Sequence, residues 1–335
     1  MSLPAPPADP VTWIIILNWH GADDTIACID GVRALTGGRW RLAVCDNAST
    51  DDSLERLEAA LRQRFGDGLG IIDQSSVDQP SRDEAVPDRD VWLVRNTANH
   101  GYAGGNNVGL RLALRDPEMG FAWVLNNDTV PESGALAALL AHAAAHPRQG
   151  IIGSTLLYAD RPGVIQGAGG ACYNRWTGLV RHLGLNEPRS TAKDYAGTRF
   201  DYVIGAAMFI RRAWLEQVGL MDPGFFLYFE EIDYCRRGRH LFDLGYAPDS
   251  IVLHKEGGTT GGHRHEISLL ADFYNLRNRL RVTWRHFPYA MPTILAGLAV
   301  TALNRLRRGQ ADRLPMIWRI LWNFRHIRYE DVRRA

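Results

Sequence analysis

The chain has 335 residues, of which 46% are hydrophobic and 22% are charged. These values are typical of a folded globular protein and exclude a disordered or fibrous chain. The formal net charge of +1 gives no electrostatic argument for nucleic acid, and we expect no nucleic-acid partner.

The cysteines and the apolar stretches indicate the cellular compartment of the protein. The four cysteines form no CxxC pair and have no zinc-type spacing, so we expect reduced, buried thiols at Cys28, Cys45, Cys172 and Cys235. The opening MSLPAPPADP lacks the basic start of a signal peptide. The apolar stretch 291–303 is shorter than the roughly 20 residues of a membrane-spanning helix. We therefore expect a cytoplasmic protein.

Strands alternate with helices through the first 145 residues. Apolar runs predict strands over 11–17, 42–45, 91–94 and 122–125. Helical spacing or capping residues predict helices over 23–35, 54–61, 106–114 and from Pro131 to near His146. The polar, acidic segment 66–90 lacks periodicity and is predicted to be a long surface loop. This rhythm predicts an α/β fold with a parallel sheet and right-handed crossovers.

The pattern changes after residue 145. Strand-like runs at 151–158 and 201–210 alternate with Gly-rich turns, and a helix that contains an acidic cluster is predicted over 225–241. We expect 1–145 to be the nucleotide-sugar-binding half of one domain and 146–265 its acceptor-binding, catalytic half. Residues 266–335 are expected to form a C-terminal helical, basic-aromatic region.

Arg residues are mixed with Trp and Phe throughout that last region, in RNRLRVTWRHF, NRLRRG and WRILWNFRHIRYEDVRRA. This mixture has two interpretations. It can form a face that lies on a membrane surface. It can equally form a solvated helical face whose aromatic side chains anchor the core.

Polar residues follow each predicted parallel strand of the first half. Ligands of open parallel sheets bind at the carboxyl ends of the strands, so these residues are the candidates for a site. We expect all four strand ends to line one edge. The candidates are Asn18, Asp46, Arg95, Asn96, Asn126, Asn127 and Asp128.

The run GYAGGNN at 101–107 lies between the third strand and its helix, and it contains Gly104 and Asn106. It matches neither a dinucleotide fingerprint nor a P-loop. Its glycines can let the backbone approach a ligand and open a helix N-terminus that binds anions. Alternatively, it is a tight strand-to-helix turn with Asn caps.

Two strand-end carboxylates each have a structural and a functional interpretation. Asp46 can accept a hydrogen bond from a pyrimidine imide N–H or cap the next helix, although Ser49 or Asp51 is better placed as the cap. Asp128 can be a turn residue or hold a divalent metal on a diphosphate, because Mg²⁺ and Mn²⁺ prefer oxygen ligands.

The run YFEEIDYCRR places Glu230, Glu231 and Asp233 within four residues. At a helix N-terminus these acids gain from the helix dipole. Alternatively, like-charged neighbours raise the pKa of one carboxylate, which then acts as a general base. His254 follows a predicted strand and is either structural or a second metal ligand.

Seven stretches together resemble the inverting family 2 glycosyltransferases of the GT-A fold, particularly the bacterial rhamnosyltransferase-like group. They cover roughly 11–285 in the family's order and are VTWIIILNWHGADDTIACIDGV, VCDNASTDDS, VRNTANHGYAGGNNVGLRLAL, WVLNNDTVPE, VIGAAMFIRR, GFFLYFEEIDYCRR and FYNLRNRLRV. The resemblance implies a GT-A fold, a mostly parallel sheet flanked by helices, here with a C-terminal helical appendix.

The resemblance also implies roles for single residues. Asp46 would contact the base, and Arg95 or Asn96 would flank the nucleotide. Asn126, Asn127 and Asp128 stand where the family has its metal-binding DxD, and only Asp128 is acidic here. Glu230 and Glu231 replace the family's Glu-Asp pair, with Glu231 at the catalytic base. Asp233 and Arg237 would support that helix, and His254 matches a histidine that some members place on the metal.

The implied activity is metal-dependent, inverting transfer of a sugar from a nucleotide-diphosphate donor, with Mg²⁺ or Mn²⁺ as the cation. The group resemblance favours dTDP-L-rhamnose over UDP- or GDP-sugars. It implies a glycan or lipid-linked acceptor in cell-surface polysaccharide synthesis. The Arg/Trp-rich tail suggests peripheral contact with the inner face of the cytoplasmic membrane.

Two other activities remain open at this stage. The NND and EE departures from the family pattern raise the alternative of a catalytically silent GT-A binding or scaffold protein. A GT-A nucleotidyltransferase is a third hypothesis, but NWHGADD lacks the Gly-rich, Arg- and Lys-containing signature that this class shows after its first strand.

Overall fold

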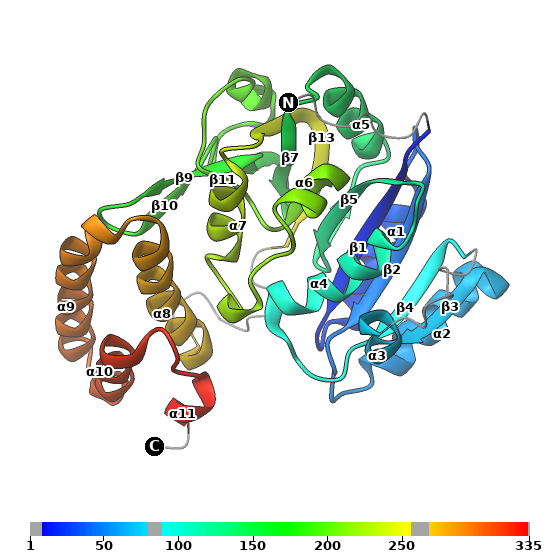
Figure 1. Cartoon of the computed structure of the whole chain (residues 1–335). Coiled ribbons are helices and arrows are strands. Elements are labelled where there is room, and N and C mark those ends of the chain that lie inside the picture. Colours follow the sequence, from blue (N-terminus) through cyan, green and yellow to red (C-terminus); the bar gives the residue numbers. More distant parts are fainter. Residues whose placement is uncertain (1–8, 80–88, 256–267, 334–335) are drawn as a thin grey trace.

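The computed structural model describes residues 9–79, 89–255 and 268–333. A central sheet runs through the described residues in the order β3-β4-β2-β1-β5-β12-β7-β13-β6, with β8 paired to β7. Helices cover both faces of this sheet, and a separate group of helices stands at the C-terminal side (Figure 1). The predicted mostly parallel sheet flanked by helices is confirmed.

Five parallel strands form the first half of the sheet. They are β1 (Val11–Asn18), β2 (Trp40–Asp46), β3 (Leu69–Asp73), β4 (Val91–Arg95) and β5 (Met119–Asn126). Along β1, Trp13 and Ile15 pack into one core, while Ile14 and Ile16 pack into the other. This two-sided burial explains why the strand is a continuous apolar run rather than an alternating one.

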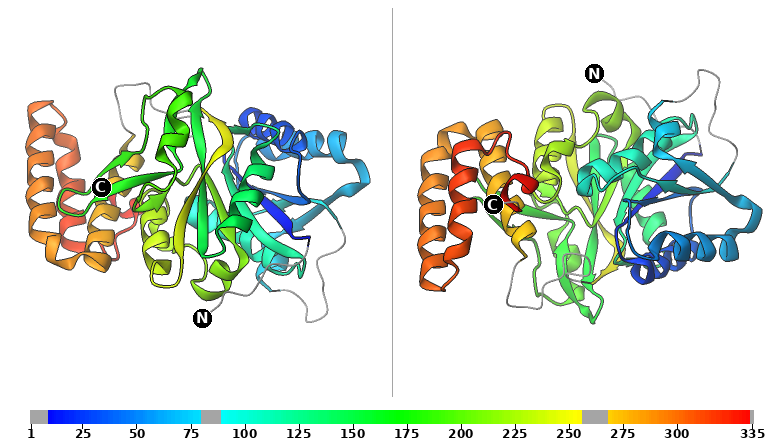
Figure 2. Two further views of the ribbon diagram at one scale, coloured as in Figure 1. Left: turned by 90° about the horizontal axis from the view of Figure 1, so that it is seen from above. Right: turned by 90° about the horizontal axis from the view of Figure 1, so that it is seen from below.

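The helices divide between the two faces of the sheet (Figure 2). On one face lie α1 (Ala22–Arg33), α2 (Ser53–Phe65) and α5 (Ala135–Ala145), whose buried side chains join the core of Ile14 and Ile16. On the other face lie α4 (Gly101–Leu114), α6 (Arg212–Gln217) and α7 (Glu230–Gly238). The catalytic candidates of α7 therefore share a face with the glycine-containing helix α4.

The second half extends the sheet with strands of mixed direction. β12 (Ala207–Arg211) is antiparallel to β5 and to β7 (Gln149–Tyr158), and β13 (Asp243–His254) is parallel to β7. The short β6 (Thr129–Pro131) is antiparallel to β13, and β8 (Arg161–Ala168) is antiparallel to β7. A three-stranded sheet of β9 (Gly170–Asn174), β10 (Leu179–His182) and β11 (Tyr202–Val203) projects toward the C-terminal helices.

Three predicted elements differ from the structure. The segment 66–90 is not simply a loop, because β3 and α3 (Gln74–Asp78) occupy its first part, while 80–88 lie outside the described residues. The strand was hidden because LGIID is short and carries a glycine, against which Trp92 packs. Helix α4 begins at Gly101 rather than Asn106, and α7 begins at Glu230 rather than at residue 225.

The C-terminal region contains α8 (Leu269–His286), α9 (Met291–Arg307), α10 (Leu314–Asn323) and the short α11 (Tyr329–Arg333). These helices share a hydrophobic cluster of their own, which includes Phe273, Leu280, Ile294 and Ile320. No helix in the part of the chain that the structure describes is long and apolar enough to cross a membrane.

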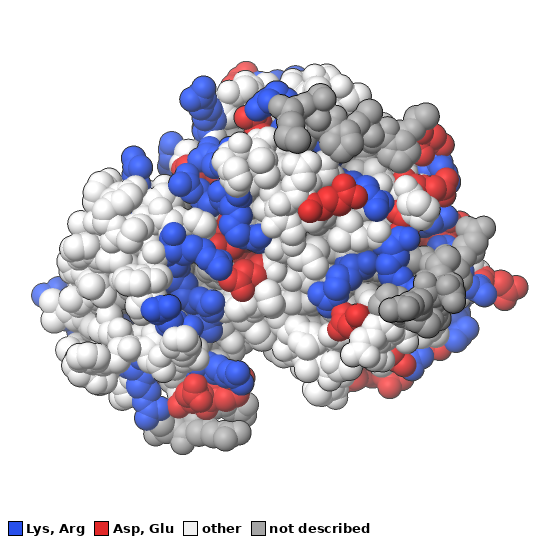
Figure 3. Space-filling model, viewed as in Figure 1, with Lys and Arg blue, Asp and Glu red and all other residues white. Residues whose placement is uncertain are grey.

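The structure contains residues that support each of the two interpretations of the basic-aromatic region. Arg305 and Arg313 turn inward, where each donates to the buried carboxylate of Asp272. In contrast, Trp318 and Trp322 are 62% and 74% exposed. Lys and Arg side chains gather where α8 meets the sheet domain, and the surface over α9 is largely uncharged (Figure 3).

Candidate active site

The carboxyl ends of β1, β2, β4 and β5 meet at one edge of the sheet. Asn18 pairs in register with Asp46, and Asp46 pairs with Arg95. Asn126 pairs with Leu17, the residue before Asn18. His254 ends β13, which runs parallel to β7 and in the same direction as β5. The structure thus brings the strand-end candidates to a common edge.

Asn18 and Asp46 form a buried hydrogen-bonded frame at this edge. Asn18 donates through Nδ2 to Asp46 Oδ1 at 2.8 Å and accepts through Oδ1 from Thr25 Oγ1 at 2.8 Å. Asp46 also accepts from the backbone N–H and the hydroxyl of Ser49, at 2.9 and 2.7 Å. Its side chain is 2% exposed. In this structure the Asp46 carboxylate holds the strand end and its following turn together.

Asn47 organises the next strand end. Its Oδ1 accepts from the backbone N–H of His100 at 3.1 Å and from Asn96 Nδ2 at 3.2 Å. Its Nδ2 donates to Asn99 Oδ1 at 2.9 Å. Asn96 is buried within this network, whereas Arg95 is exposed to solvent. Of the two residues predicted to flank the nucleotide, Arg95 is therefore accessible to solvent, whereas Asn96 is not.

Gly104 and Asn106 lie inside α4 rather than in a ligand-facing loop. A Cβ at Gly104 would meet His100 Cβ at 2.7 Å, so this glycine permits close packing within the protein. Asn106 is fully buried and donates to the Tyr102 carbonyl at 2.9 Å. The backbone at Gly101 does need glycine, since its φ is +68° and a Cβ would lie 2.3 Å from the Phe226 carbonyl oxygen.

A cavity of about 400 Å³ opens beside this edge. Of the predicted residues, Asn126 and Asn127 line it. The other lining residues are Leu17, Trp19, Asn47, Asn99, Gly101, Tyr102, Phe226, Leu227, Ser268, Leu270 and Ala271, and Gly101 and Tyr102 open the GYAGGNN run, for which a ligand contact was one interpretation. Trp19 and Asn47 directly follow the predicted Asn18 and Asp46, so adjacency at the strand end was the available signal.

Asp128 and His254 face each other across the β6–β13 pair. Asp128 Oδ1 lies 3.3 Å from His254 Nε2, and Lys255 N–H donates to the Asp128 carbonyl at 3.0 Å. The other ring nitrogen, Nδ1, lies 2.6 Å from Gln166 Oε1. An amide oxygen can only accept, so Nδ1 carries a proton; in the neutral tautomer with that proton, the Nε2 lone pair would lie on the side of Asp128.

This pair has the chemistry of a divalent-cation site that substrate completes. The side-chain Oδ1 atoms of Asp128 and Asn126 are buried and accept no hydrogen bond from the residues that the structure describes. Among the described residues, no group of three or more His, Cys, Asp or Glu side chains has the arrangement to hold a metal alone. Mg²⁺ is commonly bound by one or two protein oxygens together with substrate phosphates and water, and the residues present fit that mode.

Glu230 and Glu231 open helix α7 directly after a residue with a left-handed backbone, Phe229, whose φ is 70°. The Oε2 atoms of both carboxylates are buried and have no hydrogen-bond partner within residues 9–79, 89–255 and 268–333. Burial raises the pKa of Glu231 to about 7. Burial, followed by the charge of Glu231, raises the pKa of Glu230 well above its ordinary value. Desolvation, rather than like charge alone, thus prepares Glu231 to accept a proton near neutral pH.

Tyr102 connects the two acids to the cavity. It lines the cavity, and its hydroxyl donates to the Gly205 carbonyl at 2.5 Å. Burial, and then the charges of Glu230 and Glu231, raise the pKa of this tyrosine well above its ordinary value. The charges of the two carboxylates therefore act on a residue of the cavity wall.

Asp233 belongs to a different environment from the glutamates. Its buried carboxylate accepts from Arg237 Nε at 3.0 Å and Arg285 at 2.9 Å, and it lies 2.8 Å from His286 Nε2. Burial opposes ionisation, but these partners outweigh it and lower the pKa of Asp233. Asp233 and Arg237 thus tie α7 to its own next turn and to α8.

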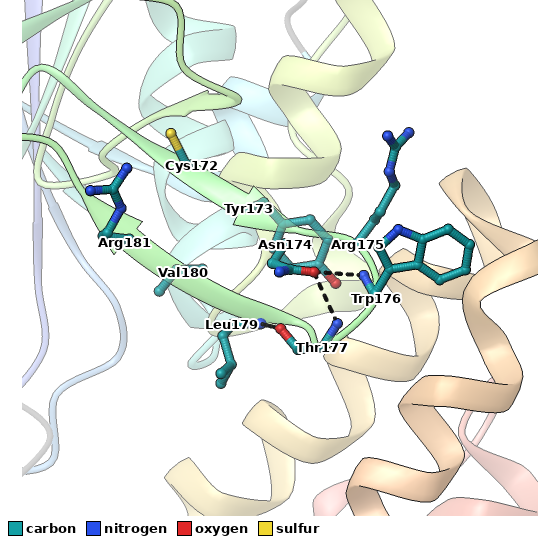
Figure 4. Close-up of a pocket in the computed structure, with 9 residues that line it drawn as sticks. All are labelled: Cys172, Tyr173, Asn174, Arg175, Trp176, Thr177, Leu179, Val180 and Arg181. Carbon is teal, nitrogen blue, oxygen red and sulfur yellow. Dashed lines mark hydrogen bonds between the residues drawn. The ribbon is translucent and has the colours of Figure 1, made fainter.

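A second hollow of about 740 Å³ lies along the β9–β10 hairpin and contains none of the predicted site residues (Figure 4). At its turn, Asn174 Oδ1 accepts from the backbone N–H groups of Trp176 and Thr177. Trp176 packs edge-on against Tyr289 at a centroid distance of 5.4 Å. The hairpin therefore reaches the junction between α8 and α9.

The model of the family described as glycosyl transferase family 2 matches residues 13–219. The chain belongs to this family. The match extends from β1 through the strand ends to α6, and it confirms the resemblance inferred from the motifs.

Two curated relatives of this family 2 chain have names that describe the transfer of a sugar. The low-salt glycan biosynthesis hexosyltransferase Agl10 of Haloferax volcanii is 30% identical over 188 residues, covering 56% of this chain and 59% of that protein. This chain thus spans less than two thirds of Agl10. The N-acetylglucosaminyl-diphospho-decaprenol L-rhamnosyltransferase of Mycobacterium tuberculosis is 27% identical over 302 residues, covering 79% of this chain and 93% of that protein.

Solved structures share the fold at low sequence identity. GalNAc-T7 with UDP, GalNAc and Mn²⁺ superposes with a TM-score of 0.57 at 16% identity, covering 83% of this chain and 48% of that one. The mannosyltransferase PcManGT from Pyrobaculum calidifontis, with GDP-Man and Mn²⁺, gives 0.52 at 16% identity and covers 95% and 87%. The GT-A fold of the family 2 chain is thereby confirmed.

Proposed function

We propose that this family 2 protein is an inverting glycosyltransferase that moves a sugar from a nucleoside-diphosphate donor onto an acceptor hydroxyl. The observation that carries the proposal is the Glu231 carboxylate: its Oε2 atom is buried with no hydrogen-bond partner among the described residues, and burial raises its pKa to about 7. It is an electrostatic neighbour of Tyr102 in the cavity wall. A general base works best when its pKa lies close to the operating pH.

In the proposed reaction, Glu231 takes the proton of the acceptor hydroxyl as that oxygen attacks the anomeric carbon. The bond from this carbon to the diphosphate breaks on the opposite face, so the anomeric configuration inverts. Burial and the charge of Glu231 raise the pKa of Glu230 well above its ordinary value, which disfavours a second negative charge beside the base. Asn126 and Asn127 line the cavity, where they would contact the donor.

The proposed cation site consists of Asp128 and His254, with Asn126 Oδ1 as a further oxygen. A bound Mg²⁺ or Mn²⁺ would supply positive charge that stabilises the departing diphosphate. Gln166 would hold His254 in the tautomer whose Nε2 is free to bind a metal. The two Mn²⁺-containing structures with the same fold support a divalent cation as the cofactor.

For the donor, we propose dTDP-L-rhamnose, with UDP- and GDP-sugars as alternatives. The mycobacterial L-rhamnosyltransferase, which covers 79% of this chain, supports this choice. Its name also supports a lipid-linked acceptor. We propose a lipid-linked or glycan acceptor in cell-surface polysaccharide synthesis, at the inner face of the cytoplasmic membrane. The exposed Trp318 and Trp322 then supply a peripheral membrane contact.

The test is a panel of dTDP-, UDP- and GDP-sugars with and without Mn²⁺, read by thermal shift and by release of nucleoside diphosphate. We expect one nucleotide to stabilise the protein in a Mn²⁺-dependent manner. Release of the diphosphate should fall about 1,000-fold in Glu231→Gln while nucleotide binding persists. Glu55→Gln, at an exposed position of α2, is the matched control and should behave as wild type.

Each failure of this test has a separate meaning. Pyrophosphate as the product would replace the proposal with a nucleotidyltransferase. Nucleotide binding without any turnover would favour the silent scaffold, for which the asparagines at 126 and 127 are the motivating feature. Full activity of Glu231→Gln would overturn the assignment of the base.

A further inference from the structure

The four residues before helix α7 have an unusual backbone. Phe226, Tyr228 and Phe229 have φ values of 64°, 65° and 70°. Bulky residues rarely adopt this left-handed region, and such strain persists only where the surroundings enforce it. We call residues 224–229 the pre-helix loop. This loop ends directly at Glu230 and Glu231, so its conformation fixes where the base begins.

One side chain of α8 holds much of the pre-helix loop. Asn278 is fully buried, and the two hydrogens of its Nδ2 are shared among the carbonyls of Phe225, Leu227 and Tyr228, at 2.8, 2.7 and 2.9 Å. Each of these carbonyls immediately precedes one of the three left-handed residues. A single amide group therefore compensates the backbone groups that the strained conformation turns away from ordinary secondary structure.

The orientation of the Asn278 amide is itself fixed by a neighbour. Arg277 Nε donates to Asn278 Oδ1 at 3.0 Å, which directs Nδ2 toward the loop. The guanidinium groups of Arg277 and Arg281 also donate to the Gly224 carbonyl at the start of the loop. Burial lowers the pKa of Arg277 to about 10, so the guanidinium remains charged at neutral pH.

The opposite side of the same loop forms a wall of the donor cavity. Phe226 and Leu227 line that cavity. The Phe226 carbonyl accepts from the Tyr102 N–H at 2.6 Å, at the first turn of α4. The Phe226 ring stacks on Tyr274 of α8, with centroids 4.7 Å apart. The loop is thus clamped between α4 and α8 with the cavity on one side and the glutamates at its end.

We propose that Asn278 is a positioning residue that sets both the Phe226–Leu227 wall of the donor cavity and the placement of Glu231. The inference rests on the proposed function, both for the role of Glu231 and for the use of nucleotide affinity to report on the cavity wall. Asn278 is not among the described residues that line the cavity. It acts through three backbone carbonyls of the loop.

The test compares Asn278→Ala with Asn275→Ala, a matched change on the same helix. Among the described residues, Asn275 donates to the Ala271 carbonyl of its own helix alone. For each variant, the active fraction is titrated by the stoichiometry of nucleotide binding. The nucleotide Kd, kcat and KM are then measured per active site. Arg277→Lys serves as a second variant, because it removes the bond that orients the Asn278 amide without removing the amide.

In Asn278→Ala, we expect kcat per active site to fall about 100-fold, as misplacement of a catalytic group by about 1 Å does. We expect the nucleotide Kd to rise several-fold, roughly threefold to tenfold, since the cavity wall shifts with the loop. Arg277→Lys should change both values in the same direction but less. Asn275→Ala should match wild type.

A purely structural role would give a different result. It would reduce the fraction of folded protein and leave kcat and Kd per active site unchanged, which would overturn the proposal. If Asn278→Ala does not fold, the same values in Arg277→Lys decide the question. If wild type shows no turnover with any donor, the proposed function fails, and an unchanged nucleotide Kd in the variants would separately overturn the link to the cavity wall.

Discussion

Two neighbouring regions of this site treat their polar side chains in opposite ways. At the ends of β1 and β2, Asn18 and Asp46 are buried and their polar atoms bond to one another and to nearby side chains. At Asn126, Asp128 and the two glutamates of α7, one buried oxygen of each side chain has no hydrogen-bond partner in the described part of the chain. Buried polar groups are normally hydrogen-bonded. The first region therefore has a structural role, and the unpaired oxygens of the second region are the candidates to bind a ligand or a proton.

The largest expected effect lies in the unpaired region. Asp128→Ala removes the only acid of the NND run, and we expect kcat/KM to fall at least about 100-fold. Stabilisation by nucleotide should also lose its dependence on Mn²⁺, which thermal shift measures directly. Asp160→Ala, at an exposed position, is the control. Retained Mn²⁺-dependence in Asp128→Ala would place the cation elsewhere.

The frame should respond through stability instead. Asn18→Ala leaves Asp46 Oδ1 and Thr25 Oγ1 without this partner, and we expect the free energy of unfolding to fall by about 2 kcal/mol. Urea denaturation measures this loss, with the exposed Asn304→Ala as the control. If Asn18→Ala keeps its stability but loses nucleotide binding, Asn18 is a ligand-contacting residue and the contrast between the regions breaks down.

Glu231 provides a pH test of the same contrast. Its pKa is about 7 in the folded protein and about 4.5 in the unfolded chain, so the folded state binds the proton more tightly. Stability from this group is therefore full below pH 4.5 and is lost as the pH rises through 7. We expect Glu231→Gln to melt about 3 °C above wild type at pH 8 and to match it at pH 4.5.

A calorimetric series across this pH range would make that comparison, with Glu55→Gln beside it. Equal melting temperatures of wild type and Glu231→Gln at pH 8 would mean that Glu231 ionises without a penalty. In that case, the carboxylate has a partner in the folded protein, and the distinction from the Asn18 frame is lost for this residue.

The smallest expected effect concerns the surface of the C-terminal helices. Trp318→Ala combined with Trp322→Ala should weaken sedimentation with anionic vesicles about tenfold, while the melting temperature stays unchanged because both rings are largely exposed. The exposed Trp176 on the β9–β10 hairpin offers a control, Trp176→Ala. Equal vesicle binding by the double variant and wild type would contradict the membrane contact.

Sequence patterns predicted the buried strands of the sheet better than the turns and helix starts between them. The apolar runs of β1 and β5 announced buried parallel strands, and the strand-end residues followed from that topology. Gly104 and Asn106 suggested a ligand-facing loop, because glycines in a helix look like a turn unless the packing partner is known. Only the structure shows that Gly101 admits the Phe226 carbonyl and that α4 begins there.

The partners of the site residues were beyond reach of the sequence. Nothing local to Gln166 indicates that it fixes the ring of His254. Asn278 lies in a segment whose resemblance to the family was evident, but its role depends on a strained loop some fifty residues earlier in the chain. Contacts between distant segments decide both cases, and periodicity describes only neighbours in sequence.

The position of β13 has a consequence for how the protein matures. This strand is the last of the sheet in chain order, yet it lies between β7 and β6 and brings His254 to Asp128. The two residues therefore meet only after a long, non-local strand pairing is complete, a step with high contact order. A nascent or half-folded chain presents Asp128 alone, so the proposed cation site would be complete only in a finished sheet.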